Sequence, residues 1–590
     1  MVSGLIPGAF LVVVTWLFIC LLITFYGRFI AGLISRKSEV RSDHLWRIGL
    51  WWGLTVATSA TLALGFRVPL GSAMAGVVIL GLGIVLGIAG IALIRPKGPH
   101  WKKPTKSTVT FLIASWLAFT YLAFKALGPV TNYDSGLYHL GAIKYAADYA
   151  AIPGLANLYF PFGYSNAQFP LAALLGNGPW DGIGYRLMNG AILAFALADL
   201  SSRLLNRRWS WGTFTLLFGL SAALIPMVAM ADDMVTSPTA DTSVMLLTLA
   251  AATYFADALQ MRLSAYEDAL TAITLAGLTV AFRPTMVVFA LSILVVAAIF
   301  VWRKRHEVKP QPVPLILTSA LLSLLASLSL LRDRTLSGWI FYPLSNFPLP
   351  VPWLARNPDP WRIGTLAAAR DPSTQDGFQT AHSYDWIFIW LTRLPFQWEP
   401  WFLLVGFVAA TAVVVIAWRV QVLQGVRTRF LVALIPSSLA LVVWFFFSPP
   451  SFRFVWGPSL VLLALPLGIA TAQLLHAQVN ILGPCAIRRI ALVSSAFCLL
   501  SVTLFSAVER NQFDTISQER TWRLGSVAVD YSITPVPRPA VTSIDLKDGL
   551  TIQAPVDGDQ CWDNYPLCVF YTGQPIEPRG PSIQDGFNYG

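Results

Sequence analysis

Long apolar blocks alternate with short polar segments along most of the chain. Residues 1–34, 50–64, 74–94 and 109–123 are each long enough, or nearly so, to cross about 30 Å of hydrocarbon as a helix. Similar blocks recur as far as residue 507, so the pattern predicts an all-α polytopic membrane protein with about fourteen transmembrane helices. The expected helices span residues 5–34, 48–66, 72–94, 107–126, 183–202, 211–230, 240–259, 268–282, 284–302, 313–331, 398–418, 430–447, 455–475 and 490–507.

Clusters of lysine and arginine occupy every second loop between these blocks. By the positive-inside rule, the face that carries the clusters is cytoplasmic. The opposite face then receives the polar loops 127–182, 231–241, 332–397 and 448–454, together with the chain beyond residue 508. The basic residues are Arg36, Lys37, Arg41, Arg47, Arg95, Lys97, Lys102, Lys103, Lys106, Arg203, Arg207, Arg208, Arg303, Lys304, Arg305, Arg419, Arg427, Arg429, Arg488 and Arg489.

The composition agrees with a membrane protein. Of the 590 residues, 55% are hydrophobic and only 12% are charged, which is too few to cover the surface of a soluble protein of this size. A net charge of +11 is compatible with nucleic-acid binding. However, the lysines and arginines lie in short clusters between apolar blocks, as in the cytoplasmic loops of membrane proteins. We therefore expect no nucleic-acid partner. The first apolar block has no basic segment before it and no clear cleavage site, which favours a retained helix.

Arg283 and Pro284 interrupt the apolar stretch from Asp268 to Trp302. An even number of crossings is needed here to keep the basic clusters on one side of the membrane. Proline disfavours a helical conformation at the preceding residue and removes a backbone donor. Two half-helices that meet near the outer leaflet satisfy both requirements, and such breaks are tolerated where they line a polar cavity.

The region after residue 508 is polar and rich in proline and glycine. Residues 541–546 and 550–553 flank Lys547-Asp548-Gly549, which predicts a short hairpin in a small β-containing appendage. Cys561 and Cys568 lie in this exported region, where an oxidising compartment favours a disulfide over two free thiols. We expect the appendage to pack over the outer ends of the helices, as a stabilising cap, a lid or an acceptor-binding surface.

A polar motif, Tyr133-Asp134-Ser135-Gly136-Leu137-Tyr138-His139, follows directly after the fourth expected helix. Asp134 is the first carboxylate outside the membrane, and residues 140–151 have an amphipathic pattern suited to the membrane interface. Carboxylates at the rim of a membrane cavity commonly serve a functional site. The alternative is that Asp134 caps the interfacial helix, and the two roles are compatible.

A second acidic cluster lies in the loop 231–241 on the same face. Asp232, Asp233 and Asp241 repel one another there unless a cation, a donor or a hydroxyl-rich ligand compensates their charge. An aspartate such as Asp241, taken alone, is more often a helix cap or a polar residue that faces the interior of the bundle, but two outward loops that both carry carboxylates favour a site.

Two arginines and a tyrosine complement these carboxylates. Arg283 at the broken helix and Arg453 at the outer end of the thirteenth helix are suited to binding a lipid phosphate, or to anchoring at the interface or forming a salt bridge. Tyr342 lies in an aromatic part of the large loop, which is suited to stacking on a sugar but is equally typical of an interfacial belt.

Together these features resemble the GT-C superfamily of integral-membrane glycosyltransferases, and most of all a bacterial family of multi-pass membrane proteins. The resemblance runs from about residue 107 to the C-terminus, so it divides the chain into extra N-terminal helices (1–106), a GT-C-like core (107–507) and an exported C-terminal region (508–590). The segments that carry it are 133–139, 152–158, 237–241, 337–343, Arg453 and 558–563.

The resemblance implies transfer of a sugar from a polyprenyl-phosphate donor to a glycan, lipid or protein acceptor at the outer face of a bacterial plasma membrane. Asp134 would be the catalytic base, acting with inversion at the anomeric carbon, and Arg283 would neutralise the leaving phosphate. Asp232, Asp233 and His139 would orient the acceptor or help to hold a divalent cation, and a metal requirement stays open. The substrate-binding candidates are Tyr133, His139, Asp232, Asp233, Asp241, Arg283, Tyr342 and Arg453.

Two departures from the GT-C pattern qualify this interpretation. Ser135 follows Asp134 where some families have a second acid, and Arg283 stands where several have a lysine. The alternatives are a transporter or flippase of lipid-linked sugars, a polysaccharide polymerase or ligase, and a receptor or scaffold. A transporter also needs access from the cytoplasm, so the clustering of acidic motifs on the outer face favours the enzyme.

Overall fold

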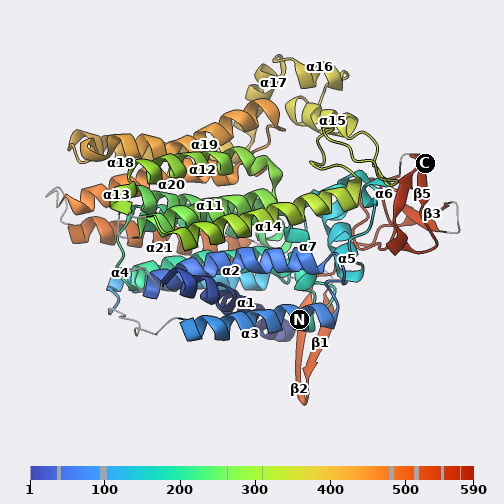
Figure 1. Cartoon of the computed structure of the whole chain (residues 1–590), viewed down its shortest axis with the longest axis horizontal. Helices are drawn as coiled ribbons and strands as arrows, with labels where there is room; N and C mark the ends of the chain where they lie inside the picture. The colour runs from blue at the N-terminus through green and yellow to red at the C-terminus, as the bar shows by residue number, and fades with distance from the viewer. Residues whose placement is uncertain are drawn as a thin grey trace.

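The structure is a computed structural model that describes residues 2–35, 42–93, 103–261, 264–308, 310–477, 484–509, 517–546, 550–571 and 573–590. Within these ranges the molecule is a bundle of long helices, with its strands and most of its short helices gathered at one end (Figure 1). The long helices are α1 (Val2–Ser35), α2 (Ser42–Leu64), α3 (Ala73–Leu93), α4 (Lys106–Lys125), α8 (Met188–Leu205), α9 (Trp211–Ala229), α10 (Ala240–Leu259), α11 (Ala265–Phe282), α12 (Val287–Arg303), α14 (Pro312–Ser337), α18 (Trp398–Arg419), α19 (Arg427–Phe447), α20 (Trp456–His476) and α21 (Pro484–Glu509).

Twelve helices in the described ranges are long and apolar enough to cross a membrane, which confirms the predicted polytopic helical architecture. Each of the fourteen expected ranges contains a helix, but α2 and α11 do not count among the twelve spans. α2 buries His44 and Arg47, and α11 buries Glu267 and Asp268. Because α2 packs on α1 and α11 packs on α10, these polar side chains are kept away from lipid.

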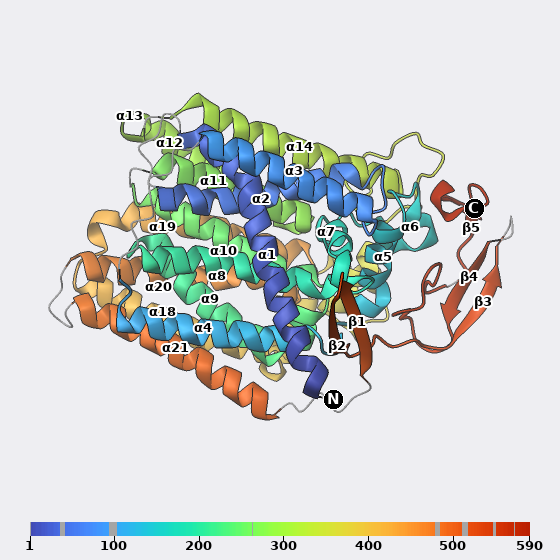
Figure 2. The same cartoon turned by 90° about the horizontal axis from the view of Figure 1, so that it is seen from below.

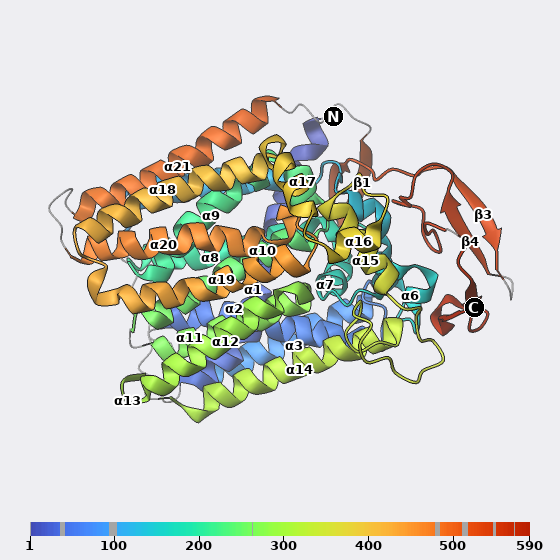
Figure 3. The ribbon, with the colours of Figure 1, turned by 90° about the horizontal axis from the view of Figure 1, so that it is seen from above.

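α10 lies at the centre of the bundle. All of its residues are buried, and it packs against α8, α9, α11 and α20 (Figure 3). By contrast, α3, α12 and α18 bury at most 22% of their apolar stretch, as expected of helices that face lipid. α1 crosses the bundle obliquely and packs on α2, α3 and α4 (Figure 2).

A buried network of ion pairs joins α2, α8 and α10 at the end of the bundle away from the strands. Arg203 Nε lies 2.6 Å from Asp199 Oδ1, and Arg203 Nη1 lies 2.5 Å from Asp257 Oδ2. Arg47 Nε lies 3.6 Å from Asp199 Oδ1. Arg47 and Arg203 were expected in cytoplasmic loops, but both are fully buried. Their burial is tolerated because these carboxylates compensate their charges inside the bundle.

The chain breaks at Arg283 and Pro284 as predicted. α11 ends at Phe282, a single short turn follows, and α12 begins at Val287. The shorter helical elements are η1 (Ser135–His139), α5 (Leu140–Asp148), α6 (Leu155–Leu158), η2 (Phe160–Gly163), α7 (Gln168–Leu174), η3 (Gly178–Trp180), η4 (Gly184–Leu187), η5 (Asp232–Thr236), η6 (Pro284–Met286), α13 (Arg305–Val308), α15 (Asp359–Arg370), α16 (Gly377–His382), α17 (Trp386–Arg393), η7 (Leu394–Phe396), η8 (Gln424–Val426), η9 (Phe452–Phe454) and η12 (Ile583–Asp585).

The C-terminal region forms three small antiparallel hairpins: β1 (Gln518–Leu524) with β2 (Val527–Ile533), β3 (Val541–Asp545) with β4 (Thr551–Pro555), and β5 (Ile576–Pro578) with β6 (Phe587–Tyr589). The predicted hairpin corresponds to β3 and β4, and its turn residues 547–549 lie outside the described ranges. Cys561 and Cys568 form the predicted disulfide. The region is tied to the helices, since Thr534 N–H donates to the Leu127 carbonyl at 2.8 Å and Phe587 N–H to the Pro153 carbonyl at 3.0 Å.

Candidate active site

Asp134 forms an ion pair with Arg453, which lies in the short helix η9 before α20. The distance from Asp134 Oδ2 to Arg453 Nη1 is 2.9 Å. Asp134 stands at the N-cap position of η1, yet its side chain makes no capping hydrogen bond. The carboxylate is therefore held by a guanidinium, and the alternative role of Asp134 as a helix cap is not the one that the structure adopts.

A second ion pair joins Asp241 to Arg283. Asp241 lies in the first turn of α10, where the side chain of Thr239 provides the cap. Arg283 is the residue at which α11 ends, so the broken helix places its guanidinium opposite the start of α10. Because proline follows Arg283, the helix cannot continue through this position without distortion.

The two ion pairs lie side by side and share one aromatic ring. The guanidinium carbon of Arg283 lies 4.9 Å from the centre of the Phe454 ring, and that of Arg453 lies 4.8 Å from it. Such contacts between a cation and an aromatic face are attractive. Four of the residues singled out in the sequence are thus brought together around Phe454.

Hydrogen bonds from buried side chains hold the two acidic loops together. Ser237 Oγ accepts the backbone N–H groups of Thr131 and Asn132, both at 3.1 Å, and donates to the Asp232 carbonyl at 2.7 Å. Asn189 Nδ2 donates to three carbonyls of the segment 234–239 at 3.0–3.1 Å. These bonds satisfy backbone groups that irregular loops leave unpaired, and they fix the Asp134 loop against the Asp232 loop.

Asp233 is a third carboxylate in this group. Burial raises the pKa of Asp233, and Asp241 and Asp232 raise it further, whereas a hydrogen bond with Asn132 and the charge of Arg453 lower it. Asp232 is itself only 9% exposed. The structure therefore gathers all the acidic candidates at the same end of the bundle, with two arginines among them.

His139 forms part of the aromatic wall beside the ion pairs. Burial lowers the pKa of His139 to about 3, Asp241 raises it, and Arg453 and Arg283 lower it. The imidazole is therefore neutral at physiological pH and is a weak base. Its ring centre lies 4.4 Å from that of Tyr138, and its Nδ1 lies 3.3 Å from Ser135 Oγ.

Tyr133 is bound by the C-terminal region. Its hydroxyl donates to the Asp559 carboxylate, and its carbonyl accepts from Gln560 Nε2 at 2.7 Å. Burial, followed by the hydrogen bond to Asp559, raises the pKa of Tyr133 to about 12. Inside the loop that the disulfide closes, Trp562 N–H donates to the Gly136 carbonyl at 3.0 Å. The C-terminal region thus covers the Asp134 loop directly.

Tyr342 is not brought to the ion pairs. Its side chain is only 3% exposed, and its hydroxyl donates to the Phe160 carbonyl at 3.0 Å. The Tyr342 ring lies 5.9 Å from Tyr164, whose ring lies 5.7 Å from Tyr138. Tyr342 therefore supports Tyr164 from behind, and a sugar does not reach its covered face in this conformation.

Sequence reasoning missed three aromatic residues of the site. Phe454 adjoins Arg453 in the sequence, and Tyr138 lies within the Asp134 motif, so position along the chain offered a signal for both. Tyr164 carried no such signal, because only the folded chain brings it beside Tyr138. Within the described ranges, no three His, Cys, Asp or Glu side chains are grouped as metal ligands, so a divalent cation gains no geometric support there.

A comparison with known families covers most of this arrangement. A family described as a domain of unknown function, DUF8201, matches residues 10–459. The chain belongs to the DUF8201 family. The DUF8201 match contains both ion pairs, most of α1, and α2 and α3, while the disulfide and all the described strands lie beyond it. No curated protein matches the sequence.

Proposed function

We propose that this DUF8201 protein is a membrane glycosyltransferase that takes a sugar from a polyprenyl-phosphate donor. The acceptor is a glycan, lipid or protein of the cell envelope, and transfer takes place at the non-cytoplasmic face of a bacterial plasma membrane. The observation that carries the proposal is the pairing of Asp134 with Arg453 beside that of Asp241 with Arg283, at the end of the bundle where α11 breaks. The GT-C-like order of the motifs along the sequence supplies the reaction class.

In the proposed reaction, Asp134 accepts the proton of an acceptor hydroxyl. The acceptor oxygen forms a bond to the anomeric carbon as the bond from that carbon to the phosphate oxygen breaks. The electron pair of the broken bond stays on the lipid phosphate, and the configuration at the anomeric carbon inverts. A carboxylate is a suitable base here, because the hydroxyl becomes acidic only as its oxygen bonds to carbon in the transition state.

The arginines suit the charges that change during this reaction. Arg453 lies against Asp134 and orients its carboxylate. Arg283 offers a guanidinium for the phosphate, whose negative charge grows as the sugar leaves. Asp241 pairs with Arg283 in the structure, so an anionic donor has to share or replace this partner. Such competition favours donors that carry a phosphate over neutral sugars.

The transfer of label from a radiolabelled polyprenyl-phosphate sugar tests this proposal. Membranes carrying the wild type, Asp134→Asn and the control Asp181→Asn are compared; Asp181 is an exposed aspartate in the loop 127–182. We expect turnover in the wild type and the control, and none in Asp134→Asn. Equal turnover in Asp134→Asn and the wild type would contradict the role of Asp134. Movement of the labelled lipid across the bilayer without any sugar release would favour a flippase.

A further inference from the structure

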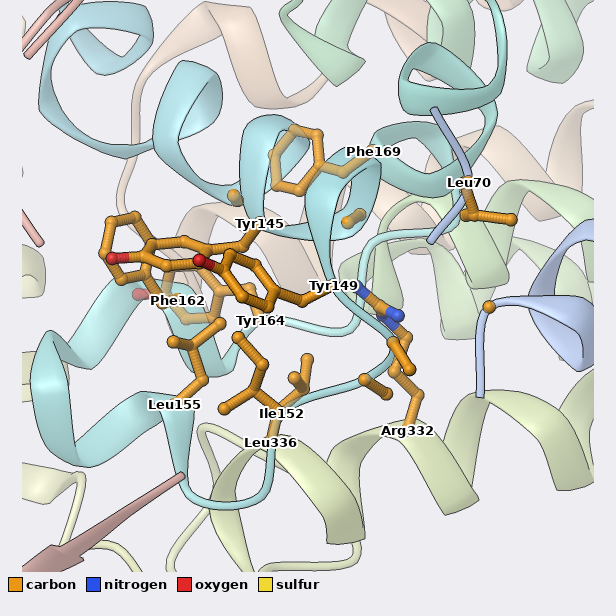
Figure 4. A pocket seen from close by; sticks show the side chains of 15 residues that line it. Leu70, Tyr145, Tyr149, Ile152, Leu155, Phe162, Tyr164, Phe169, Arg332 and Leu336 are labelled. Carbon is orange, nitrogen blue, oxygen red and sulfur yellow. The ribbon is translucent and has the colours of Figure 1, made fainter. Parts of the chain in front are cut away.

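A small pocket lies behind the proposed catalytic loop (Figure 4). It is enclosed by α5, α7, the α2–α3 connection and the outer end of α14. Its walls combine aliphatic side chains with aromatic ones, which include Tyr145, Tyr149 and Tyr164. Arg332 of α14 is the arginine among its lining residues, and Figure 4 shows the Arg332 guanidinium pointing from α14 toward the segment that carries Tyr149.

No direct contact neutralises the charge of Arg332 within the described ranges. The residue is only 8% exposed, its Nε makes no hydrogen bond, and its side chain forms neither a hydrogen bond nor an ion pair with any described residue. The adjacent Asp333 is buried as well, at 7% exposure, but no ion pair joins its carboxylate to the guanidinium in the described structure. Asp333 attracts Arg332 electrostatically without contacting it directly. A buried guanidinium without a directly contacting anion is costly, so a ligand that brings an anion is favoured.

The position of Arg332 indicates where such an anion comes from. Arg332 lies in the penultimate turn of α14, which ends at Ser337, and this end of the bundle carries the polar loops. The flank of α14 below it is apolar and open, since Leu324 is 50% exposed and Leu331 is 46% exposed. A lipid packed along this flank would have its phosphate near the outer end of the helix, where headgroups lie.

We propose that the pocket around Arg332 binds the phosphate group of an anionic lipid. The planar fork of a guanidinium matches two phosphate oxygens, and the aromatic walls exclude water from the contact. Arg67, in the connection that supplies Gly65 and Leu70 to the pocket, is exposed and adds a second positive charge near it. This site is distinct from the two ion pairs and does not depend on the proposed transfer reaction.

Binding to the purified full-length protein in phosphatidylcholine nanodiscs tests this proposal. The probes are short-chain phosphatidic acid, the corresponding diacylglycerol without phosphate, and inorganic phosphate. The variants are Arg332→Gln and the matched control Arg334→Gln, which removes the same charge from an exposed position of the same helix. We expect phosphatidic acid to bind, diacylglycerol not to bind, and Arg332→Gln to weaken binding by about tenfold or more while Arg334→Gln leaves it unchanged.

The other outcomes are equally decisive. Equal binding of phosphatidic acid by Arg332→Gln and the wild type would overturn the proposal. Binding of inorganic phosphate as tight as that of phosphatidic acid, and lost in Arg332→Gln, would overturn the lipid as the source and leave a soluble phosphate.

A second measurement uses only the wild type, so it tests the proposal even if Arg332→Gln does not fold. A phosphatidic acid analogue with a photoreactive group beside its phosphate should label residues 142–155 or 328–337, which border the pocket. Labelling confined to other segments would contradict the proposal. Arg332→Lys keeps the charge but loses the fork, so it should retain binding at reduced affinity.

Discussion

The Asp134 carboxylate lies 2.9 Å from the Arg453 guanidinium and thereby joins the loop before α5 to the loop before α20. The Phe454 ring next to Arg453 also contacts the guanidinium of Arg283, which is paired with Asp241. Two carboxylates and two guanidiniums from four separate segments therefore form one charged cluster. The contacts of this cluster, and of the loops that hold it in place, lead to four predictions.

Replacing Arg453 should impair the proposed sugar transfer more than it impairs folding. Arg453→Gln removes the cation that orients Asp134, so we expect kcat/KM to fall by about a hundredfold, in the range seen when one oriented donor is lost from an active site. Arg453→Lys should fall between this variant and the wild type, because it keeps the charge without the fork. The control is Arg523→Gln, since Arg523 is exposed on β1. A wild-type rate in Arg453→Gln would contradict the proposed role of the pair.

Asp241 and Arg283 should be coupled in stability. Either single change, Asp241→Asn or Arg283→Gln, leaves one charge of a largely buried pair without its partner, so we expect each to cost about 3 kcal/mol in the free energy of unfolding. The double variant should lose clearly less than the two single losses added together. Thermal unfolding of all four proteins in one detergent measures this coupling. If the two single losses simply add up in the double variant, the ion pair contributes nothing to the free energy of unfolding.

His139 should make the folded protein sensitive to mild acid. Burial lowers the pKa of His139 to about 3, whereas an unfolded histidine titrates near about 6.5. Between these values the unfolded state binds more protons, so the free energy of unfolding falls as the pH falls below about 6.5. From pH 7 to pH 5 the expected loss is about 2 kcal/mol. His139→Phe keeps an aromatic ring beside Tyr138 and should lose less stability over this range. If the variant and the wild type lose the same free energy of unfolding from pH 7 to pH 5, the effect of His139 burial is contradicted.

Gly136 should be essential for the fit of the C-terminal region. A Cβ atom at this position would overlap the indole ring of Trp562, so Gly136→Ala should displace the disulfide loop from the Asp134 loop. We expect faster proteolysis of the region after residue 517 and reduced transfer. Gly364→Ala is the matched control, because nothing lies within 4 Å of a Cβ atom there. Gly136→Ala combined with Trp562→Gly should restore activity in part, and a failure of Gly136→Ala to alter proteolysis would show that the contact is dispensable.

The sequence alone was sufficient for the helices, the break at Arg283-Pro284, the hairpin of β3 with β4 and the disulfide. Each of these follows from local physical chemistry: apolar length, the missing donor of proline, turn residues, or two cysteines close together in the sequence. The sequence also singled out Asp134, Asp241, Arg283 and Arg453 as candidates. It left open whether each was a cap, an anchor or a salt-bridge partner, because that choice depends on what lies opposite.

Only the tertiary structure decided the partners. Ion pairs form between groups a few ångströms apart, and folding sets such distances between residues that are remote in the sequence. Folding paired Asp134 with Arg453 and enclosed Tyr342 behind Tyr164. It also left the Arg332 guanidinium without a hydrogen bond or ion pair to any described residue. Folding also placed Arg47 and Arg203 inside the bundle, although both belong to basic clusters that lie between apolar blocks in the sequence. Composition and periodicity record what a segment prefers locally, whereas charge pairing is a property of the packed bundle.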